Sequence, residues 1–180
     1  MNVIDKIGTP LANEEFKQFR TINGGKPVEG SLYYHYARMI EVLYGLERVG
    51  QLLEDPDILS SDVRNYPTDL QIPGNGVGVI EAPRGTLFHD YSTDENGILT
   101  RVNLIVATGN NNWAMHTASG AVAKAFVKGN ELTEGMLNRV EAAIRCYDPC
   151  LSCSTHAIGK MPLVITLKAA DGTVLDRIAR

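Results

Sequence analysis

The stretch that decides the fold class is residues 76–107, GVGVIEAPRGTLFHDYSTDENGILTRVNLIVA. Its apolar residues come in short runs and at alternate positions, which is typical of β-strands. We predict strands over residues 76–80, 86–91 and 98–107. Asp94-Glu95-Asn96-Gly97 is a strong turn signal, so we expect the last two strands to form a hairpin.

The sequence before this stretch indicates helices. We expect a short helix over residues 13–20, with Asn13 as its N-cap and with Phe16 and Phe19 on one face. The strongest helical pattern covers residues 31–53. Its apolar residues recur at steps of three and four and are expected to line one face: Leu32, Tyr36, Met39, Ile40, Leu43, Leu46, Val49 and Leu53.

The sequence after it predicts two more helices and a second hairpin. The helices cover residues 114–127 and 133–146, the latter with Thr133 as N-cap and with Met136, Leu137, Val140 and Ile144 facing inward. Residues 163–168 and 173–178 alternate around an Asp-Gly turn, which predicts paired strands. Helices and hairpins are segregated along the chain. We therefore predict an α+β fold in a single domain, residues 1–180.

Composition excludes several classes of protein. The chain has 180 residues, 44% hydrophobic and 21% charged, with a net charge of -4, so it resembles a globular domain and not a nucleic-acid binder. No apolar run is long enough to span a membrane, and the N-terminus does not resemble a signal peptide. Three cysteines do not make a disulfide framework. We expect a cytoplasmic protein.

The chemistry concentrates in one short segment. After Cys146, the sequence Asp148-Pro149-Cys150-Leu151-Ser152-Cys153-Ser154-Thr155-His156 places two thiols and an imidazole in a C-x-x-C-x-x-H pattern. Thiolates are soft ligands that suit zinc, nickel and low-valent iron. From spacing alone, a zinc site, a redox thiol pair and simple burial all stay open. Cys146 itself is expected to be a buried packing residue.

Three segments together resemble the large subunit of nickel-iron hydrogenases. They are the Asp-Pro-Cys-x-x-Cys-x-x-His string at 148–156, Ala-Pro-Arg-Gly at 82–85 followed by Phe-His-Asp-Tyr at 88–91, and residues 106–113, VATGNNNW. Their order matches the C-terminal part of that family. The residues of these motifs are most similar to those of the cytoplasmic group that serves NAD-linked or viologen-reducing enzymes. The resemblance implies oxidation or production of dihydrogen.

The resemblance implies a role for each motif residue. Cys150 and Cys153 are expected to bind a Ni-Fe(CN)2CO centre, and Cys150 also to take up a proton. His156 is expected to bind a magnesium or iron ion. Arg84 is expected to lie over the open coordination position with Asp148 as its partner. Pro83 would narrow the cavity, and Thr108 would hydrogen-bond a cyanide of the iron. Without the resemblance, Arg84 and Asp148 are an ordinary ion pair, and Thr108 bonds local backbone.

The family's second cysteine pair, Arg-x-Cys-Gly-x-Cys, has no counterpart in residues 1–145. We therefore expect a C-terminal fragment that is inactive alone and holds no complete centre. The resemblance implies as partners the missing N-terminal half, an iron-sulfur small subunit, a maturation protease and nickel-insertion proteins. It also implies that residues 157–180 are a propeptide removed after His156.

Two other functions compete with the hydrogenase interpretation. One is a metal-free scaffold like the relatives of this subunit in respiratory complex I, although Arg84, Cys150 and Cys153 argue against it. The other is a thiol or zinc-binding module.

Overall fold

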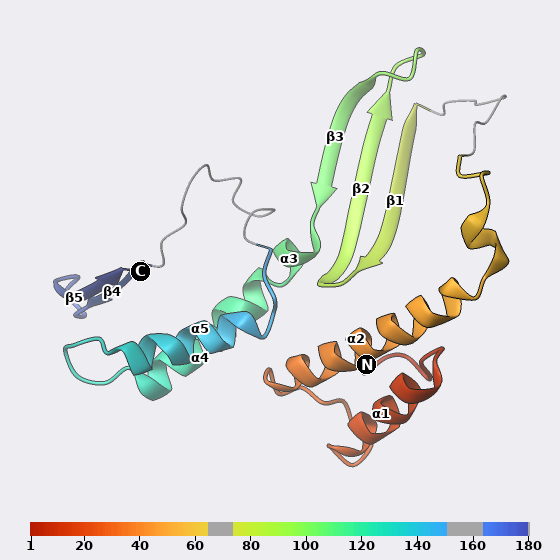
Figure 1. The fold of residues 1–180 in the computed structure, drawn as a ribbon. Helices are drawn as coiled ribbons and strands as arrows, with labels where there is room; N and C mark the ends of the chain where they lie inside the picture. Colours follow the sequence, from red (N-terminus) through yellow and green to blue (C-terminus); the bar gives the residue numbers. More distant parts are fainter. Residues whose placement is uncertain (65–73, 151–163, 180) are drawn as a thin grey trace. The chain divides into compact units, whose positions relative to one another are not determined.

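The computed structural model describes residues 1–64, 74–150 and 164–179 (Figure 1). The chain divides into two compact units, Met1–Leu70 and Gln71–Arg180. Helices are joined by antiparallel hairpins, which confirms the predicted α+β class. The single-domain organisation expected from the sequence stays a prediction.

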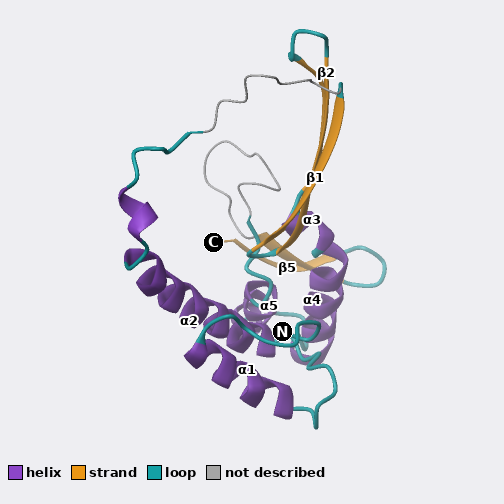
Figure 2. Ribbon diagram, turned by 90° about the vertical axis from the view of Figure 1, so that its right-hand side faces the viewer, coloured by secondary structure: helices purple, strands orange, loops and turns teal. Residues whose placement is uncertain are grey.

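The first unit is a pair of helices, α1 (Pro10–Thr21) and α2 (Tyr33–Leu53), followed by a short 3-10 helix, η1 (Pro56–Leu59). Figures 1 and 2 show α1 and α2 side by side. Phe16 and Phe19, which were predicted to share a face, are both buried, and the Phe19 ring packs edge-on against Tyr36 with centroids 5.5 Å apart. The core of this unit is small: Ala12, Phe16, Phe19, Val28 and Ile40.

A carboxylate from α2 satisfies the N-terminus of α1. Glu47 accepts hydrogen bonds from the N–H groups of Leu11, at 3.0 Å, and Ala12, at 2.9 Å. The first N–H groups of a helix have no partner within the helix, and their partial positive charge favours an anion. The prediction that Asn13 caps this helix is wrong, because α1 begins at Pro10 and the Asn13 side chain accepts instead from the N–H of Ile7.

Helix α2 forms where predicted, but its apolar residues do not share one buried face. Ile40 is buried, with Tyr36 and Leu43 packed against the same cluster. Met39, Leu46, Val49 and Leu53 are each more than half exposed. The apolar positions are so numerous that they cover more of the helix surface than α1 can bury.

The second unit begins with an antiparallel sheet in the order β1-β2-β3, formed by β1 (Asn75–Ala82), β2 (Gly85–Thr93) and β3 (Leu99–Ile105). The three strands confirm the sequence prediction. In the turn between β2 and β3, the Asp94 carboxylate accepts from the N–H groups of Asn96 and Ile98, and Gly97 has a φ of 80°. Arg101 and Asp90 form a bidentate ion pair across β3 and β2.

Three helices follow the sheet: α3 (Ala107–Asn110), α4 (Asn112–Phe126) and α5 (Glu134–Arg145). The predicted N-cap of α5 is confirmed, since the Thr133 hydroxyl accepts from the N–H of Met136. Helices α4 and α5 lie side by side, with the Arg139 guanidinium over the Phe126 ring at 4.2 Å (Figures 1 and 2). Helix α3 begins at Ala107, the residue at which the sequence predicts the end of the third strand.

The C-terminal strands β4 (Val164–Lys168) and β5 (Val174–Ala179) form the predicted hairpin. In its turn the Asp171 carboxylate accepts a hydrogen bond from the N–H of Thr173. This bond lowers the pKa of the Asp171 carboxyl group. The Asp176 carboxylate accepts from the N–H of Leu132 at 2.6 Å, which ties the hairpin to the loop before α5.

None of the helices in the described ranges combines the length and apolarity that a membrane crossing needs.

The Glu47 contact makes stability depend on pH. Burial acts to raise the pKa of Glu47, but the hydrogen bonds from the N–H groups of Leu11 and Ala12 oppose it, and the pKa lies below its ordinary 4.5. A carboxyl whose pKa is lowered by folding stabilises above its ordinary pKa, and this stabilisation is lost as pH falls through the folded-state pKa. We therefore expect Glu47→Gln to lower the free energy of unfolding near pH 7 and to lose most of this effect near pH ~3.

Urea unfolding followed by circular dichroism at both pH values measures this difference. Glu29→Gln, at an exposed carboxylate, is the matched control and should change little at either pH. Equal destabilisation by Glu47→Gln at both pH values would show that the charge of Glu47 is not what stabilises α1.

Candidate functional site

The turn between β1 and β2 carries the predicted arginine. Pro83 and Arg84 connect the two strands, and Gly85 then reverses the chain with a φ of 129°. L side chains rarely adopt this conformation, so Gly is the residue that fits here. The turn leaves Pro83 exposed and Arg84 half-buried.

Two asparagines at the end of α3 hold this turn from outside the sheet. The Asn111 side chain donates to the carbonyl of Arg84 at 2.8 Å, and the Asn110 side chain donates to the carbonyl of Thr86 at 2.9 Å. These carbonyls flank Gly85, so the two asparagines hold the backbone on both sides of this glycine. Sequence reasoning missed both roles. The one available signal was the run of three asparagines at 110–112.

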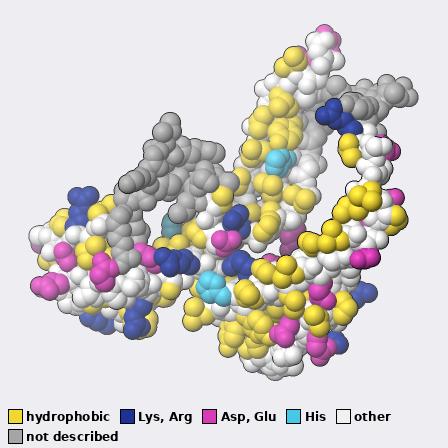
Figure 3. All heavy atoms as spheres, in the orientation of Figure 1, with side chains coloured by type: hydrophobic (Ala, Val, Ile, Leu, Met, Phe, Trp, Pro, Cys, Tyr) yellow, Lys and Arg dark blue, Asp and Glu magenta, His cyan; other side chains and the backbone are white. Residues whose placement is uncertain are grey.

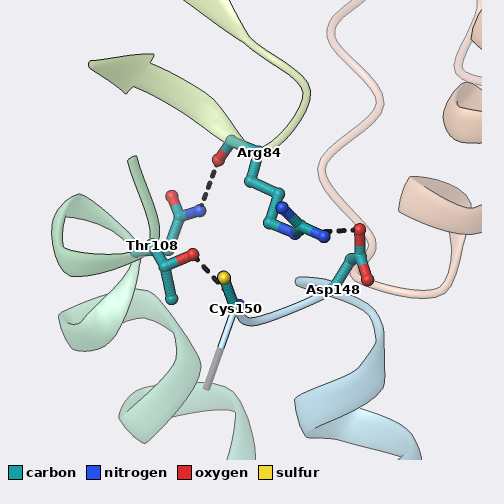
Figure 4. A network of polar contacts seen from close by, with 5 residues as sticks. Arg84, Thr108, Asp148 and Cys150 are labelled. Atoms are coloured by element: carbon teal, nitrogen blue, oxygen red, sulfur yellow. Dashed lines mark hydrogen bonds and ion pairs between the residues drawn. The ribbon is translucent and has the colours of Figure 1, made fainter. Parts of the chain in front are cut away.

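Helix α3 also holds the segment that follows α5. Thr108 is 5% exposed, and its hydroxyl accepts a hydrogen bond from the backbone N–H of Cys150 at 3.2 Å (Figure 4). The two residues are 42 positions apart in the sequence. Without the family resemblance, Thr108 was expected to hydrogen-bond nearby backbone. It does bond a backbone group, but that group belongs to Cys150, which is distant in sequence and is a predicted metal ligand.

The structure brings Arg84 and Asp148 together. The Nε atom of Arg84 lies 3.1 Å from Oδ2 of Asp148, and the side chains are 36% and 45% exposed. A pair this exposed contributes only about 0.2–1 kcal/mol to stability, so its value lies in orientation. Asp148 has a φ of 46°, a left-handed conformation that Asp tolerates better than most residues.

The site therefore unites four predicted residues from three segments. Figure 4 shows Arg84, Thr108, Asp148 and Cys150 with their hydrogen bonds and ion pair. Cys150 is half-buried. Cys153 and His156 lie outside the described residues. Within residues 1–64, 74–150 and 164–179, no three His, Cys, Asp or Glu side chains come close enough to hold a metal ion.

Comparison with known proteins identifies the family. A family model of nickel-dependent hydrogenases matches residues 25–156, which is most of the chain. The last matched residue, His156, is the histidine of the C-x-x-C-x-x-H motif. The chain belongs to the nickel-dependent hydrogenase family.

Relatives within this family are much longer than the chain. It is 45% identical to the NAD-reducing hydrogenase HoxS subunit beta of Cupriavidus necator, over 100% of this chain and 37% of that protein. It is 41% identical to the sulfhydrogenase 2 subunit alpha of Pyrococcus furiosus, over 71% of this chain and 30% of that protein. A crystal structure of an NAD+-reducing [NiFe]-hydrogenase in the H2-reduced state matches with a TM-score of 0.76 and 43% identity, over 86% of this chain and 34% of that one. The chain thus spans little more than a third of the length of these hydrogenase subunits.

Other polar residues of the hydrogenase-like motifs have structural partners. Nδ1 of His89 is hydrogen-bonded to the hydroxyl of Tyr91 on β2. Cys146 is fully buried, as expected, and its thiol donates to the carbonyl of Ala142 at 3.2 Å. Cys146 thus packs within the α5 segment, while Cys150 remains partly accessible.

The arrangement can present one thiol beside a fixed cation. Arg84 is permanently charged, and it is held by Asp148 through its side chain and by Asn111 through its carbonyl. Cys150 follows Asp148 by two residues, and its backbone is held by Thr108. A thiolate is the form in which cysteine binds metals.

We predict that Thr108→Val loosens Cys150 without disturbing the rest of the unit. Valine has nearly the same shape but cannot accept the hydrogen bond, so the Cys150 N–H loses its partner at a cost of about 1 kcal/mol. Hydrogen–deuterium exchange at the Cys150 amide should then accelerate by roughly fivefold to tenfold.

Thr117→Val is the matched control, because the Thr117 hydroxyl donates only to the Trp113 carbonyl in its own helix. Thr108→Ser, which keeps the hydroxyl, should restore slow exchange. Unchanged exchange at Cys150 in Thr108→Val would mean that this hydrogen bond does not hold the segment.

Proposed function

We propose that the chain forms part of the active site of a hydrogenase large subunit, as its C-terminal portion. The observation that carries this is the convergence of Arg84, Thr108 and Asp148 on the backbone that leads into Cys150. Membership of the nickel-dependent hydrogenase family supports it. A zinc module or a metal-free scaffold gives no reason for a half-buried arginine to be fixed beside the first cysteine.

The donor set fits a share of a nickel–iron centre. Cys150 and Cys153 would supply two thiolates, and His156 would bind a separate magnesium or iron ion. Cys146 is buried against its own helix and is not available as a third thiolate. The remaining thiolates must come from outside this chain, which contains three cysteines in all.

The chemistry that a nickel–iron centre supplies when bound is the heterolytic splitting of dihydrogen. The chain's own residues prepare the surroundings. Sγ of Cys150 would accept and release a proton, because a thiolate is a base close to the metal. Arg84 would stabilise negative charge over the open position, and the ion pair to Asp148 keeps its guanidinium in one orientation. Pro83, next to Arg84, would limit the space there, and Thr108 would fix the cysteine backbone.

The finer assignments rest on the resemblance and on the relatives' names. We propose a cytoplasmic enzyme of the NAD-linked or viologen-reducing group, with an iron-sulfur small subunit that carries the electrons. Nickel-insertion proteins and a protease would act in maturation, the protease removing residues 157–180. Within this tail, residues 164–179 form the β4–β5 hairpin, which the Asp176 carboxylate ties to the backbone N–H of Leu132.

Metal analysis of the assembled large subunit tests the proposal. Nickel and iron together, lost when Cys150 is replaced by Ala, would support it. Zinc alone would indicate a zinc module, and a stable assembly with no metal would indicate a scaffold. Thiol counting on the same samples would show whether Cys150 and Cys153 are free or bound.

We predict that the purified 180-residue chain alone has no hydrogenase activity. The chain has three cysteines and Cys146 is buried, which leaves at most two thiols for a metal, too few to hold a nickel–iron centre. Viologen reduction under dihydrogen measures this, with a complete hydrogenase of the same family as positive control. Turnover by the chain free of any other subunit would refute the prediction.

In the assembled enzyme, we predict that Arg84→Lys lowers turnover by roughly a hundredfold or more while nickel and iron content stays near normal. Lysine keeps the charge but lacks the guanidinium Nε–H that donates to Asp148, and it lacks the planar group with several donors in fixed directions. Arg101→Lys is the control, because Arg101 also pairs with an aspartate, Asp90, but on the sheet. Loss of metal together with activity would show that Arg84 maintains structure instead.

A further inference from the structure

Asn111 lies where helix α3 ends and helix α4 begins. Its backbone is helical, with a φ of -86° and a ψ of -9°, and its carbonyl accepts from the N–H of Met115 at 2.9 Å. An asparagine at the start of a helix commonly caps it through the side chain. Within residues 107–126, all of which the structure describes, the Asn111 side chain makes no such cap hydrogen bond to α4. It donates instead to the carbonyl of Arg84 at 2.8 Å.

This hydrogen bond is the firmer of the two that hold the arginine turn. Asn111 is half-buried, whereas Asn110, which donates to the carbonyl of Thr86, is exposed. A hydrogen bond is stronger where water is partly excluded. The turn also lies directly against the segment that carries Asn111, because a Cβ added at Gly85 would be 3.8 Å from the Cβ of Ala107 and 4.0 Å from Nδ2 of Asn111.

The same segment holds the backbone of the first motif cysteine. The hydroxyl of Thr108 accepts from the N–H of Cys150 at 3.2 Å, and the N–H of Asn111 donates to the carbonyl of Thr108 at 3.1 Å. One helical turn thus separates the two side chains that hold the site. Figure 4 shows the hydrogen bonds at the Arg84 carbonyl and at Cys150. The place of the arginine turn relative to the cysteine backbone therefore depends on both side chains.

The position of the Arg84 guanidinium matters because it acts as a single local charge. On the face in view in Figure 3, Lys and Arg side chains are interspersed with Asp and Glu side chains. Exposed charges are screened by salt over about 10 Å. A fixed cation promotes a reaction only where it lies beside the charge that develops. A displacement of about 1 Å can cost a large part of such an effect.

We propose that Asn111 is a positioning residue for Arg84: through the Arg84 carbonyl, it fixes where the guanidinium lies relative to Cys150. This rests on the proposed function, in which Arg84 lies over the open position. Asn111 acts through the arginine turn and is not itself a catalytic residue. Its loss should slow turnover and leave the cysteine ligands in place, because Thr108 holds the Cys150 backbone through a separate hydrogen bond.

Hydrogen exchange at the Arg84 Nε–H in the full 180-residue chain tests this positioning without any metal. Asn111→Ser makes the side chain too short to reach the Arg84 carbonyl, and Asn111→Asp keeps its shape but replaces the donor with a carboxylate oxygen. We expect both to accelerate this exchange, followed by nitrogen-15 NMR, by about threefold to tenfold, because the Nε–H leaves Asp148 more often.

Asn112→Ser is the matched control, because Asn112 is the next residue and is exposed. It should leave exchange at the Arg84 Nε–H as in wild type. The Cys150 amide is the internal reference in every variant. Its exchange should stay within about twofold of wild type, since its hydrogen bond to Thr108 does not involve the Asn111 side chain.

Turnover by the assembled large subunit tests the consequence for the reaction. We expect Asn111→Ser to lower turnover by about tenfold, with nickel and iron content near normal. In a subunit that already carries Arg84→Lys, the same substitution should change turnover by less than about twofold. This non-additivity is what an effect that passes through Arg84 requires, and a purely structural role for Asn111 would not produce it.

Three results would overturn the proposal. They are wild-type exchange at the Arg84 Nε–H in both Asn111 variants, equal acceleration at the Cys150 amide, and equal effects of Asn111→Ser with and without Arg84→Lys. Failure of the proposed function is distinguishable. An assembly that holds no nickel refutes that function, while the exchange measurement, which needs no metal, still decides whether Asn111 positions Arg84. An active nickel enzyme with unchanged exchange in the Asn111 variants refutes only the positioning role.

Discussion

The hydrogen bonds of the four-residue helix α3 and the asparagine that follows it determine where both halves of the candidate site lie. Thr108 holds the backbone of Cys150, while Asn110 and Asn111 hold the carbonyls on either side of Gly85. The arginine turn and the cysteine segment have no sequence proximity, and the ion pair between Arg84 and Asp148 is too exposed to hold them alone. The hydrogen bonds from this segment therefore hold backbone groups of the arginine turn and of the cysteine segment.

Both units have small buried cores and much exposed apolar surface. In the first unit the buried cluster contains five residues, while Met39, Leu46, Val49 and Leu53 of α2 are each more than half exposed. Hydrophobic surface of this extent stabilises a protein only when it is buried.

Local pattern was enough to predict most elements of the fold. Alternation indicated the three strands of the sheet and the C-terminal hairpin, and Thr133 indicated the start of α5. It did not predict α3, because four residues are too few to show a helical period. The contact of Glu47 with α1 could not be predicted either, since it joins residues 35 and 36 positions apart. For the same reason, family motifs named Arg84, Asp148 and Cys150, but the asparagines that hold the arginine turn needed a structure.

Asp148 combines two demands that few side chains can meet together. Its φ of 46° costs most L residues about 1–2 kcal/mol, and Gly, Asn and Asp are the types that tolerate it. The ion pair with Arg84 requires a carboxylate. Glutamate has the charge without the tolerance for this backbone, and asparagine has the tolerance without the charge. Aspartate is therefore the residue type that meets both demands, and any substitution of Asp148 destabilises the turn after α5 or removes the carboxylate that pairs with Arg84.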